Sequence, residues 1–173
     1  TSNNFSGSAY GIYMDGGSNN GHIVNNNNLS NCTNTSLTYS VGTPASISSN
    51  TFTGCNNAIY LNGATNFTLS GPGSGGPNQN VFGTGITGYQ IYLAQCNNTN
   101  VSGFNFSSHA ATPLNSRSPF LIYACSNGTF TNNIATGMNI AMRLREANTT
   151  HTITSNNFSG SVYGIFMDGG LNN

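Results

Sequence analysis

The last twenty residues of the chain repeat its first twenty. The segment from Thr154, TSNNFSGSVYGIFMDGGLNN, matches TSNNFSGSAYGIYMDGGSNN from Thr1 at an offset of 153 positions, with three exchanges. Self-similarity at a fixed period is typical of repeat proteins, in which each unit buries its apolar face against the next. We therefore expect one solenoid segment over 1–173, in which 1–153 form one long repeat and 154–173 begin the next.

A shorter period lies inside the long one. Seven tetrapeptides have apolar residues at their first and third positions, which is the period-2 pattern of a strand with one buried face. They begin at Ile12, Leu37, Ile59, Ile91, Leu121, Met142 and Ile165, with spacings of 25, 22, 32, 30, 21 and 23 residues. Helical periodicity is absent. The pattern predicts an all-β solenoid of about seven coils of 21–25 residues, with Gly- and Pro-rich loop insertions at 71–80 and 109–119.

The repeated phrases carry a family resemblance. SNNFSGSxYGIxMDG, SSNTFTGCNNAIYLNG and TSNNFSG resemble the repeats of right-handed parallel β-helix proteins, namely the pectate-lyase-like superfamily and its Asn-rich repeat families. The resemblance covers nearly the whole chain and implies a right-handed parallel β-helix. That superfamily includes lyases, hydrolases, phage tailspikes, adhesins and structural proteins, so the fold alone does not decide the function.

Asparagines recur two positions before an apolar residue that is expected to point inward. They share its parity, so we expect their amides to stack from coil to coil as an internal ladder, interrupted where Phe104 fills the slot. The alternative is simple turn chemistry, because asparagine tolerates the left-handed backbone conformation. The predicted ladder residues are Asn3, Asn27, Asn50 and Asn156.

The four cysteines fall at corresponding places on neighbouring coils. Stacked strands lie about 4.8 Å apart, which is within reach of a disulfide. We predict a Cys32–Cys55 bridge and a Cys96–Cys125 bridge, the second one residue out of register, and hence an exported protein in an oxidising compartment. Four free thiols, or a zinc site without paired CxxC spacing, are the alternatives.

Asn-x-Ser/Thr triplets are frequent, and they favour an exported glycoprotein only weakly in a chain this rich in these residues. Glycans at these positions could replace surface charge as a solubilising layer. The candidate glycosylation sites are Asn4, Asn28, Asn31, Asn34, Asn66, Asn97, Asn100, Asn105, Asn127, Asn148 and Asn157.

Charged residues are too few for the chemistry that the resemblance implies. Enzymes of this fold usually use clustered carboxylates, often with calcium, whereas only 3% of this chain is charged. Asp15 and Asp168 lie one long repeat apart and cannot act as a pair. Register sets Arg145 against Asp168, and we expect an inter-coil ion pair there rather than a lyase-type arginine base. We predict no catalytic residue, no metal ligand and no cofactor.

Aromatic residues occupy the middle, outward slot of several of the tetrapeptides. They would form a stripe along one face, able to stack on sugar rings or on a neighbouring rod. Cross-strand stacking that only stabilises the sheet is the alternative. The stripe consists of Tyr13, Tyr60, Tyr92 and Phe166.

The leading hypothesis is a structural repeat unit of a long extracellular or cell-surface β-solenoid, forming a filament, sheath or adhesin shaft with further copies of itself end to end. A carbohydrate-binding or polysaccharide-cleaving protein is the second hypothesis, and ice binding is a weaker third. The net charge is zero and lysine is absent, so nucleic acid is not an expected partner. No apolar run is long enough for membrane insertion.

Overall fold

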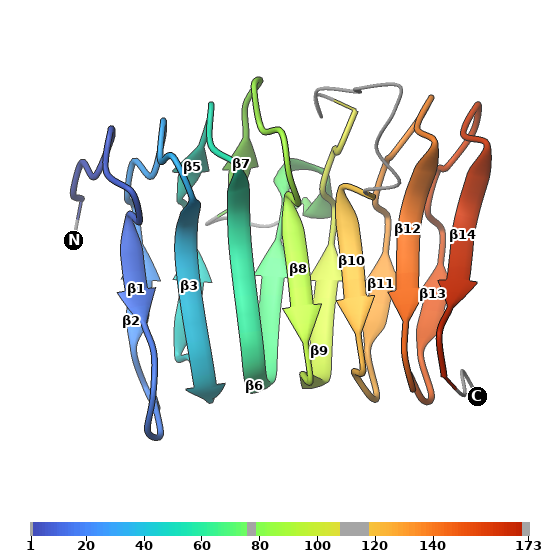
Figure 1. Cartoon of the computed structure of the whole chain (residues 1–173), viewed down its shortest axis with the longest axis horizontal. Coiled ribbons are helices and arrows are strands. Elements are labelled where there is room, and N and C mark those ends of the chain that lie inside the picture. The colour runs from blue at the N-terminus through green and yellow to red at the C-terminus, as the bar shows by residue number, and fades with distance from the viewer. Residues whose placement is uncertain (1, 76–78, 108–117, 171–173) are drawn as a thin grey trace.

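The computed structural model describes residues 2–75, 79–107 and 118–170, which form β-strands, one short 3-10 helix and no α-helix. The strands stand side by side along one long axis, and the two termini lie at opposite ends (Figure 1). Every strand pair is parallel and joins segments from successive turns of the chain. The predicted fold class, an all-β right-handed parallel β-helix, is confirmed.

Each turn of the chain, or coil, contributes one strand to the front of the largest sheet. Coils one to seven are defined by β1 (Ile12–Met14), β3 (Thr35–Gly42), β6 (Asn57–Ser70), β8 (Ile91–Ala94), β10 (Phe120–Tyr123), β12 (Ile140–Arg145) and β14 (Tyr163–Asp168). The long β6 also continues onto the back, where its C-terminal part pairs with β9. It therefore joins the front and back strands into one curled sheet.

In the described ranges, the back of the solenoid carries five further strands besides the C-terminal part of β6. They are β2 (Ile23–Asn25), β4 (Ser46–Ser48), β9 (Asn97–Ser102), β11 (Thr129–Thr131) and β13 (Thr152–Thr154). Among the described residues, the third side holds β5 (Thr51–Phe52), β7 (Val81–Phe82) and isolated bridges such as Asn4–Asn28 and Ile134–Asn157. The turns between these strands explain the abundance of asparagine, because many of them require a left-handed residue, for example Asn26 and Asn132.

Register on the front sheet aligns the first inward residues of the predicted tetrapeptides, with one correction, although β3, β6, β12 and β14 each begin two residues before the tetrapeptide. The first inward row is Ile12, Leu37, Ile59, Ile91, Phe120, Met142 and Ile165. The predicted start at Leu121 was wrong by one residue, because Phe120 and Ile122 are the residues in line with the inward residues of the neighbouring coils. All four residues of the Phe120–Tyr123 strand are apolar or aromatic, so the sequence contains two overlapping period-2 patterns and does not choose between them.

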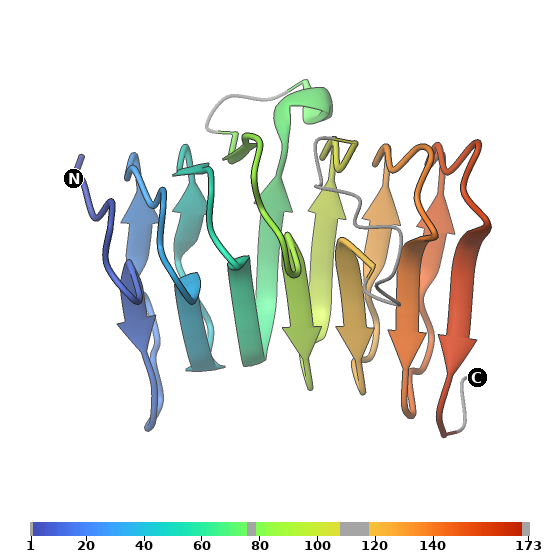
Figure 2. The ribbon, with the colours of Figure 1, turned by 45° about the horizontal axis from the view of Figure 1, so that its top comes forward.

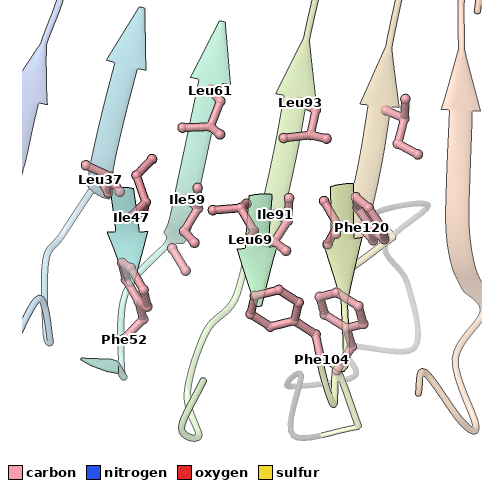
Figure 3. Packing of buried hydrophobic residues seen from close by; sticks show 14 of the residues in the cluster. Leu37, Ile47, Phe52, Ile59, Leu61, Leu69, Ile91, Leu93, Phe104 and Phe120 are labelled. Atoms are coloured by element: carbon pink, nitrogen blue, oxygen red, sulfur yellow. The ribbon is translucent and has the colours of Figure 1, made fainter. Parts of the chain in front are cut away.

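The core is a narrow interior that apolar side chains of the front and back strands fill. Figure 3 shows Leu37, Ile59 and Leu61 of the front strands facing the space that Ile47 and Leu69 enter from the back. Phenylalanines fill the wider part of this space in a chain of ring contacts with centroids 5.0–6.0 Å apart. This aromatic column comprises Phe52, Phe82, Phe104, Phe106, Phe120, Phe130 and, at its end, His151.

The asparagine ladder is present along the inner edge of the turns. Asn3 Nδ2 donates to Asn27 Oδ1 (3.1 Å), and Asn27 Nδ2 donates to Asn50 Oδ1 (3.0 Å). The same contact links Asn50 to Asn80 and Asn133 to Asn156, each at 3.0 Å. Asn50 and Asn80 also donate to backbone carbonyls, so each amide joins two coils.

Phe104 interrupts the ladder, as its position in the sequence predicts, although its backbone amide still donates to Asn133 Oδ1 (3.1 Å). The sequence analysis missed Asn80 and Asn133. Asn80 precedes Phe82 by two residues and could have been found by the same rule, whereas the apolar slot after Asn133 holds only Ala135.

The two predicted insertions lie only partly within the described residues. In the first, 71–80, a 3-10 helix η1 (Pro72–Ser74) projects beyond the coils (Figure 2), and 76–78 lie outside the described part. In the second, 109–119, only Ser118 and Pro119 are described. Strand pairing continues across both insertions, from β6 to β8 and from β8 to β10.

Two glycines with the same positive φ allow a test of the close approach of η1 to the coils. Gly103 and Gly137 both have φ +70°, but a Cβ on Gly103 would lie 2.0 Å from Ser74 N, whereas one on Gly137 would meet nothing within 4 Å. We expect Gly137→Ala to cost about 1–3 kcal/mol through backbone strain, and Gly103→Ala to cost about 1–3 kcal/mol more through the clash. Urea denaturation measures both, and equal losses would contradict the contact with η1.

Candidate functional site

The outward face of the front sheet carries the predicted aromatic stripe in one row. Register aligns Tyr13, Thr38, Tyr60, Tyr92, Leu121, Arg143 and Phe166 along the axis. The Tyr60 and Tyr92 rings are 4.9 Å apart. Phe166 is separated from Tyr92 by Leu121 and Arg143, so the row contains a tyrosine group and, farther along, a separate Phe166.

Two tyrosines that the sequence analysis did not single out widen the group. Tyr10 lies 5.0 Å from Tyr13, and Tyr89 lies 5.2 Å from Tyr92, measured between ring centroids. Both precede the first residue of their front strand by two positions, so a search for aromatics just before each tetrapeptide would have found them. We call the five tyrosines Tyr10, Tyr13, Tyr60, Tyr89 and Tyr92 the tyrosine group.

The tyrosine group surrounds two adjoining hollows on this face. One has a volume of about 350 Å³, with Thr38 and Ser40 of β3 among its lining residues and Asp15 and Asn62 at its margin. The other, about 230 Å³, is lined by Thr35, Asn57, Tyr60, Tyr89 and Tyr92. Thr35 and Tyr60 line both, so the hollows form one continuous surface along the axis.

Hydrogen bonds fix the polar groups of this surface. The Tyr13 hydroxyl donates to Asp15 Oδ2 (3.0 Å), and this bond lowers the pKa of the Asp15 carboxyl and raises the pKa of Tyr13. Burial raises the pKa of Tyr92 to about 12. The surface therefore presents flat rings, neutral hydroxyls and one carboxylate at neutral pH.

The predicted ion pair forms with a different arginine. Arg145 is the Cα partner of Asp168, but Arg143 binds the carboxylate in a bidentate pair, with Arg143 Nε 2.9 Å from Oδ1 and Nη2 bonded to Oδ2. Arg143 also lies over the Phe166 ring, 5.6 Å from its centroid. Arg145 lies 3.9 Å from Glu146 instead. A long side chain reaches the diagonal position on the next strand, which the simple register argument overlooked.

The structure has all four cysteines as buried free thiols, so the predicted disulfides are not formed. Three of the thiols point along the axis to a carbonyl of the preceding coil: Cys32 Sγ to Phe5 O, Cys96 Sγ to Leu61 O and Cys125 Sγ to Leu93 O, at 3.4–3.8 Å. The sequence-based register of Cys96 and Cys125 was also wrong. Phe120 is aligned with Ile91, so these two cysteines are at equivalent positions.

Nine of the eleven Asn-x-Ser/Thr asparagines are exposed. Asn97 is half-buried. Asn148 is buried, and its Nδ2 donates to Arg145 O (2.8 Å) and Glu146 O (3.3 Å), while its Oδ1 accepts from Cys125 N. A glycan on Asn148 would replace one of the two Nδ2 hydrogens and would have no room at this buried site, so this position is removed from the candidate glycosylation sites.

His151 is expected to make the stability of the protein depend on pH. Its Nδ1 accepts a hydrogen bond from Gly128 N (2.9 Å), its ring contacts Phe130, and burial lowers its pKa below 6.5. The unfolded chain takes up the proton first, so the free energy of unfolding should fall as pH drops below about 6.5, by at most about 1.4 kcal/mol per pH unit. Urea denaturation between pH 7.5 and 5 measures this slope. His151→Gln should flatten it, and an unchanged slope would exclude His151 as the cause.

The described residues contain no obvious centre for catalysis. They include no group of three His, Cys, Asp or Glu side chains able to hold a metal ion. Asp15 and Asp168 are six coils apart, which is about 29 Å at about 4.8 Å per coil. A further hollow of about 320 Å³, between β4 and the back of β6, has no titratable side chain in its lining. No helix in the described ranges has the length and apolar character needed to cross a membrane.

Comparison with known proteins gives one match. Residues 1–72 match the family model described as "Periplasmic copper-binding protein (NosD)". No curated protein and no solved structure matches the chain. The N-terminal three coils are thus similar to a family of parallel β-helix proteins, in agreement with the fold.

Proposed function

We propose that this chain is a structural segment of a longer β-solenoid outside the cytoplasm, serving as the shaft of a filament, sheath or adhesin. The coarser part of this proposal, a β-helix protein of the cell envelope, is supported by the periplasmic description of the matching family. The filament role rests on the chain itself. It requires that the coils continue into further repeat units.

The observation that carries the proposal is that coil seven, the second copy of the coil-one sequence, continues the stack on coil six. Ile165 and Met167 occupy the same inward positions as Met142 and Leu144 of coil six. Their exposed fractions are 39% and 58%, against 0% and 4% for the coil-six residues. Coil seven repeats the sequence of coil one, and Ile12 and Met14 of coil one are covered by Leu37 and Tyr39 of coil two. A following unit would cover Ile165 and Met167 in the same way.

Imaging of the native assembly tests the proposal. We expect an unbranched rod whose axial repeat is about 29 Å per 153 residues, from six coils at about 4.8 Å each. A native protein that behaves as a self-contained 18.0 kDa monomer, with both ends covered, would contradict the shaft.

Carbohydrate binding is the second candidate, and the hollows of the tyrosine group favour it. Flat rings spaced along the axis, with hydroxyl, amide and carboxylate groups beside them, suit stacking on sugar rings and bonding to their hydroxyls. Titration with neutral oligosaccharides, followed by amide shifts, should show saturable binding that Tyr60→Ala weakens at least about tenfold. Tyr163→Ala, outside the hollows, is the control. Binding that Tyr60→Ala leaves unchanged would contradict this site.

Neither a cleaving enzyme nor a copper protein is favoured by these side chains. The three acids provide no facing pair, and Asp168 is held by Arg143. Within the matched range the soft ligands are Met14, His22, Cys32 and Cys55. The cysteines are buried, and no three His, Cys, Asp or Glu side chains of the described part gather at one point. The residues present therefore do not fit the copper that the family description names.

A further inference from the structure

The contact between coil six and coil seven joins the end of one long repeat to the start of the next. Residues 154–170 of coil seven repeat 1–17 with two exchanges, Val162 for Ala9 and Phe166 for Tyr13. The strand β12 of coil six pairs with β14 of coil seven from Ile140↔Tyr163 to Arg145↔Asp168. In this chain, therefore, β12 of coil six is the strand that pairs with the second copy of the repeated sequence.

We propose that the free edge of coil one, carrying Tyr10, Tyr13 and Asp15, is a docking surface for the Ile140–Arg145 strand of another copy of this repeat. The inference rests on the proposed shaft and names the contact between its successive units. The occupant is a second copy, either the preceding unit of the same polypeptide or a separate chain.

The side chains of coil seven that contact coil six have counterparts on coil one. Arg143 holds Asp168 in a bidentate pair and lies over the Phe166 ring. The equivalent residues of coil one are Asp15 and Tyr13, and the exposed fraction of Tyr13 is 55%. Tyrosine keeps the aromatic face that a guanidinium covers, and the carboxylate of Asp15 is on the outer surface beside it.

Backbone groups of coil one are also available for hydrogen bonds to a preceding coil. Val162 N donates to Met138 O, and Tyr163 N donates to Asn139 O, each at 2.9 Å. The equivalent amides are those of Ala9 and Tyr10, which make no backbone hydrogen bond within the described ranges. In the same ranges β1 pairs with β3 alone. A docked coil six would supply both missing acceptors, from Met138 and Asn139 just before β12, and β12 would be a second strand neighbour.

A tandem protein, with residues 1–153 placed directly before the full chain, tests the junction against the single chain. Amide hydrogen exchange should show the Ala9 and Tyr10 amides of the second unit slowed at least about tenfold relative to the single chain. The Val162 and Tyr163 amides, which are paired in both proteins, are the internal reference.

Matched substitutions test the side chains. In the single chain, Asp168→Asn should lower the urea midpoint and Asp15→Asn should leave it nearly unchanged. In the tandem, Asp15→Asn in the second unit should lower the midpoint as Asp168→Asn does, and adding Arg143→Ala in the first unit should lower it no further. Asp15→Asn without effect in the tandem, together with fast exchange at Ala9 and Tyr10, would overturn the docking surface.

Small-angle scattering separates this failure from failure of the shaft. A continuous tandem of thirteen coils should be a rod about 62 Å long, against about 34 Å for seven coils. If the tandem is a rod but Asp15→Asn does not change its urea midpoint and the Ala9 and Tyr10 amides exchange fast, only the proposed junction is overturned. Two bodies joined by a flexible linker would contradict both the junction and the shaft.

Discussion

Replacement of Phe106 by alanine is expected to lower the free energy of unfolding by about 4–5 kcal/mol. Phe106 is fully buried, and its ring contacts those of Phe82, Phe104 and Phe120 within 6.0 Å. Truncation removes the buried side chain, leaves a cavity between two rows of strands, and breaks the aromatic column in its middle. Urea denaturation followed by circular dichroism measures the loss.

Phe106→Leu and Tyr163→Ala are the controls for this prediction. Leucine fills most of the space, so Phe106→Leu should cost clearly less than alanine at the same position. Tyr163 is half-exposed on the outer face of coil seven, and its truncation should cost little. Equal losses for Phe106→Ala and Tyr163→Ala would contradict the role of the column in stability.

The second large effect is expected for Asn50→Ala, at about 3–5 kcal/mol. Asn50 Oδ1 accepts from both Asn27 N and Asn27 Nδ2, and Asn50 Nδ2 donates to Val24 O and Asn80 Oδ1. Alanine removes all four bonds at a fully buried site, and each partner left unsatisfied costs about 1–3 kcal/mol. Urea denaturation again measures the change.

Asn28→Ala is the matched control for the ladder. Asn28 is adjacent to the ladder residue Asn27 but points outward and is exposed. Its bridges to Asn4 and Thr51 use the backbone, which alanine retains. Its replacement should change the free energy of unfolding by less than about 0.5 kcal/mol. If these asparagines mattered only because they favour turns, Asn50→Ala and Asn28→Ala would lower the free energy of unfolding by similar amounts.

Features that depend on period and parity were predictable from the sequence. The aligned inward residues Ile12, Ile59 and Met142, and the inward asparagines Asn27 and Asn50, follow from counting along the chain, because stacked coils repeat the same backbone path. The count became ambiguous only at Leu121, where consecutive apolar residues satisfy both phases of the pattern.

Features that depend on side-chain reach were not predictable in the same way. The choice of Arg143 over Arg145 as the partner of Asp168 is a matter of diagonal distance and of the Phe166 ring. The sequence places cysteines close together on neighbouring coils, but a thiol can bond to a carbonyl of the preceding coil as well as to another sulfur. Tyr10 and Tyr89 reach the hollows from the turns, where the strand pattern gives no parity.

The parallel pairing of coils has a mechanical consequence. Hydrogen bonds between coils run along the axis, so a pull on the two ends loads the contacts in series, and the weakest coil should peel away before the others. A released coil of 23 residues, such as that from Met142 to Ile165, has a contour of roughly 76–83 Å. A shaft made of these coils would therefore lengthen under tension in discrete steps of about that size, absorbing work while the remaining coils stay folded.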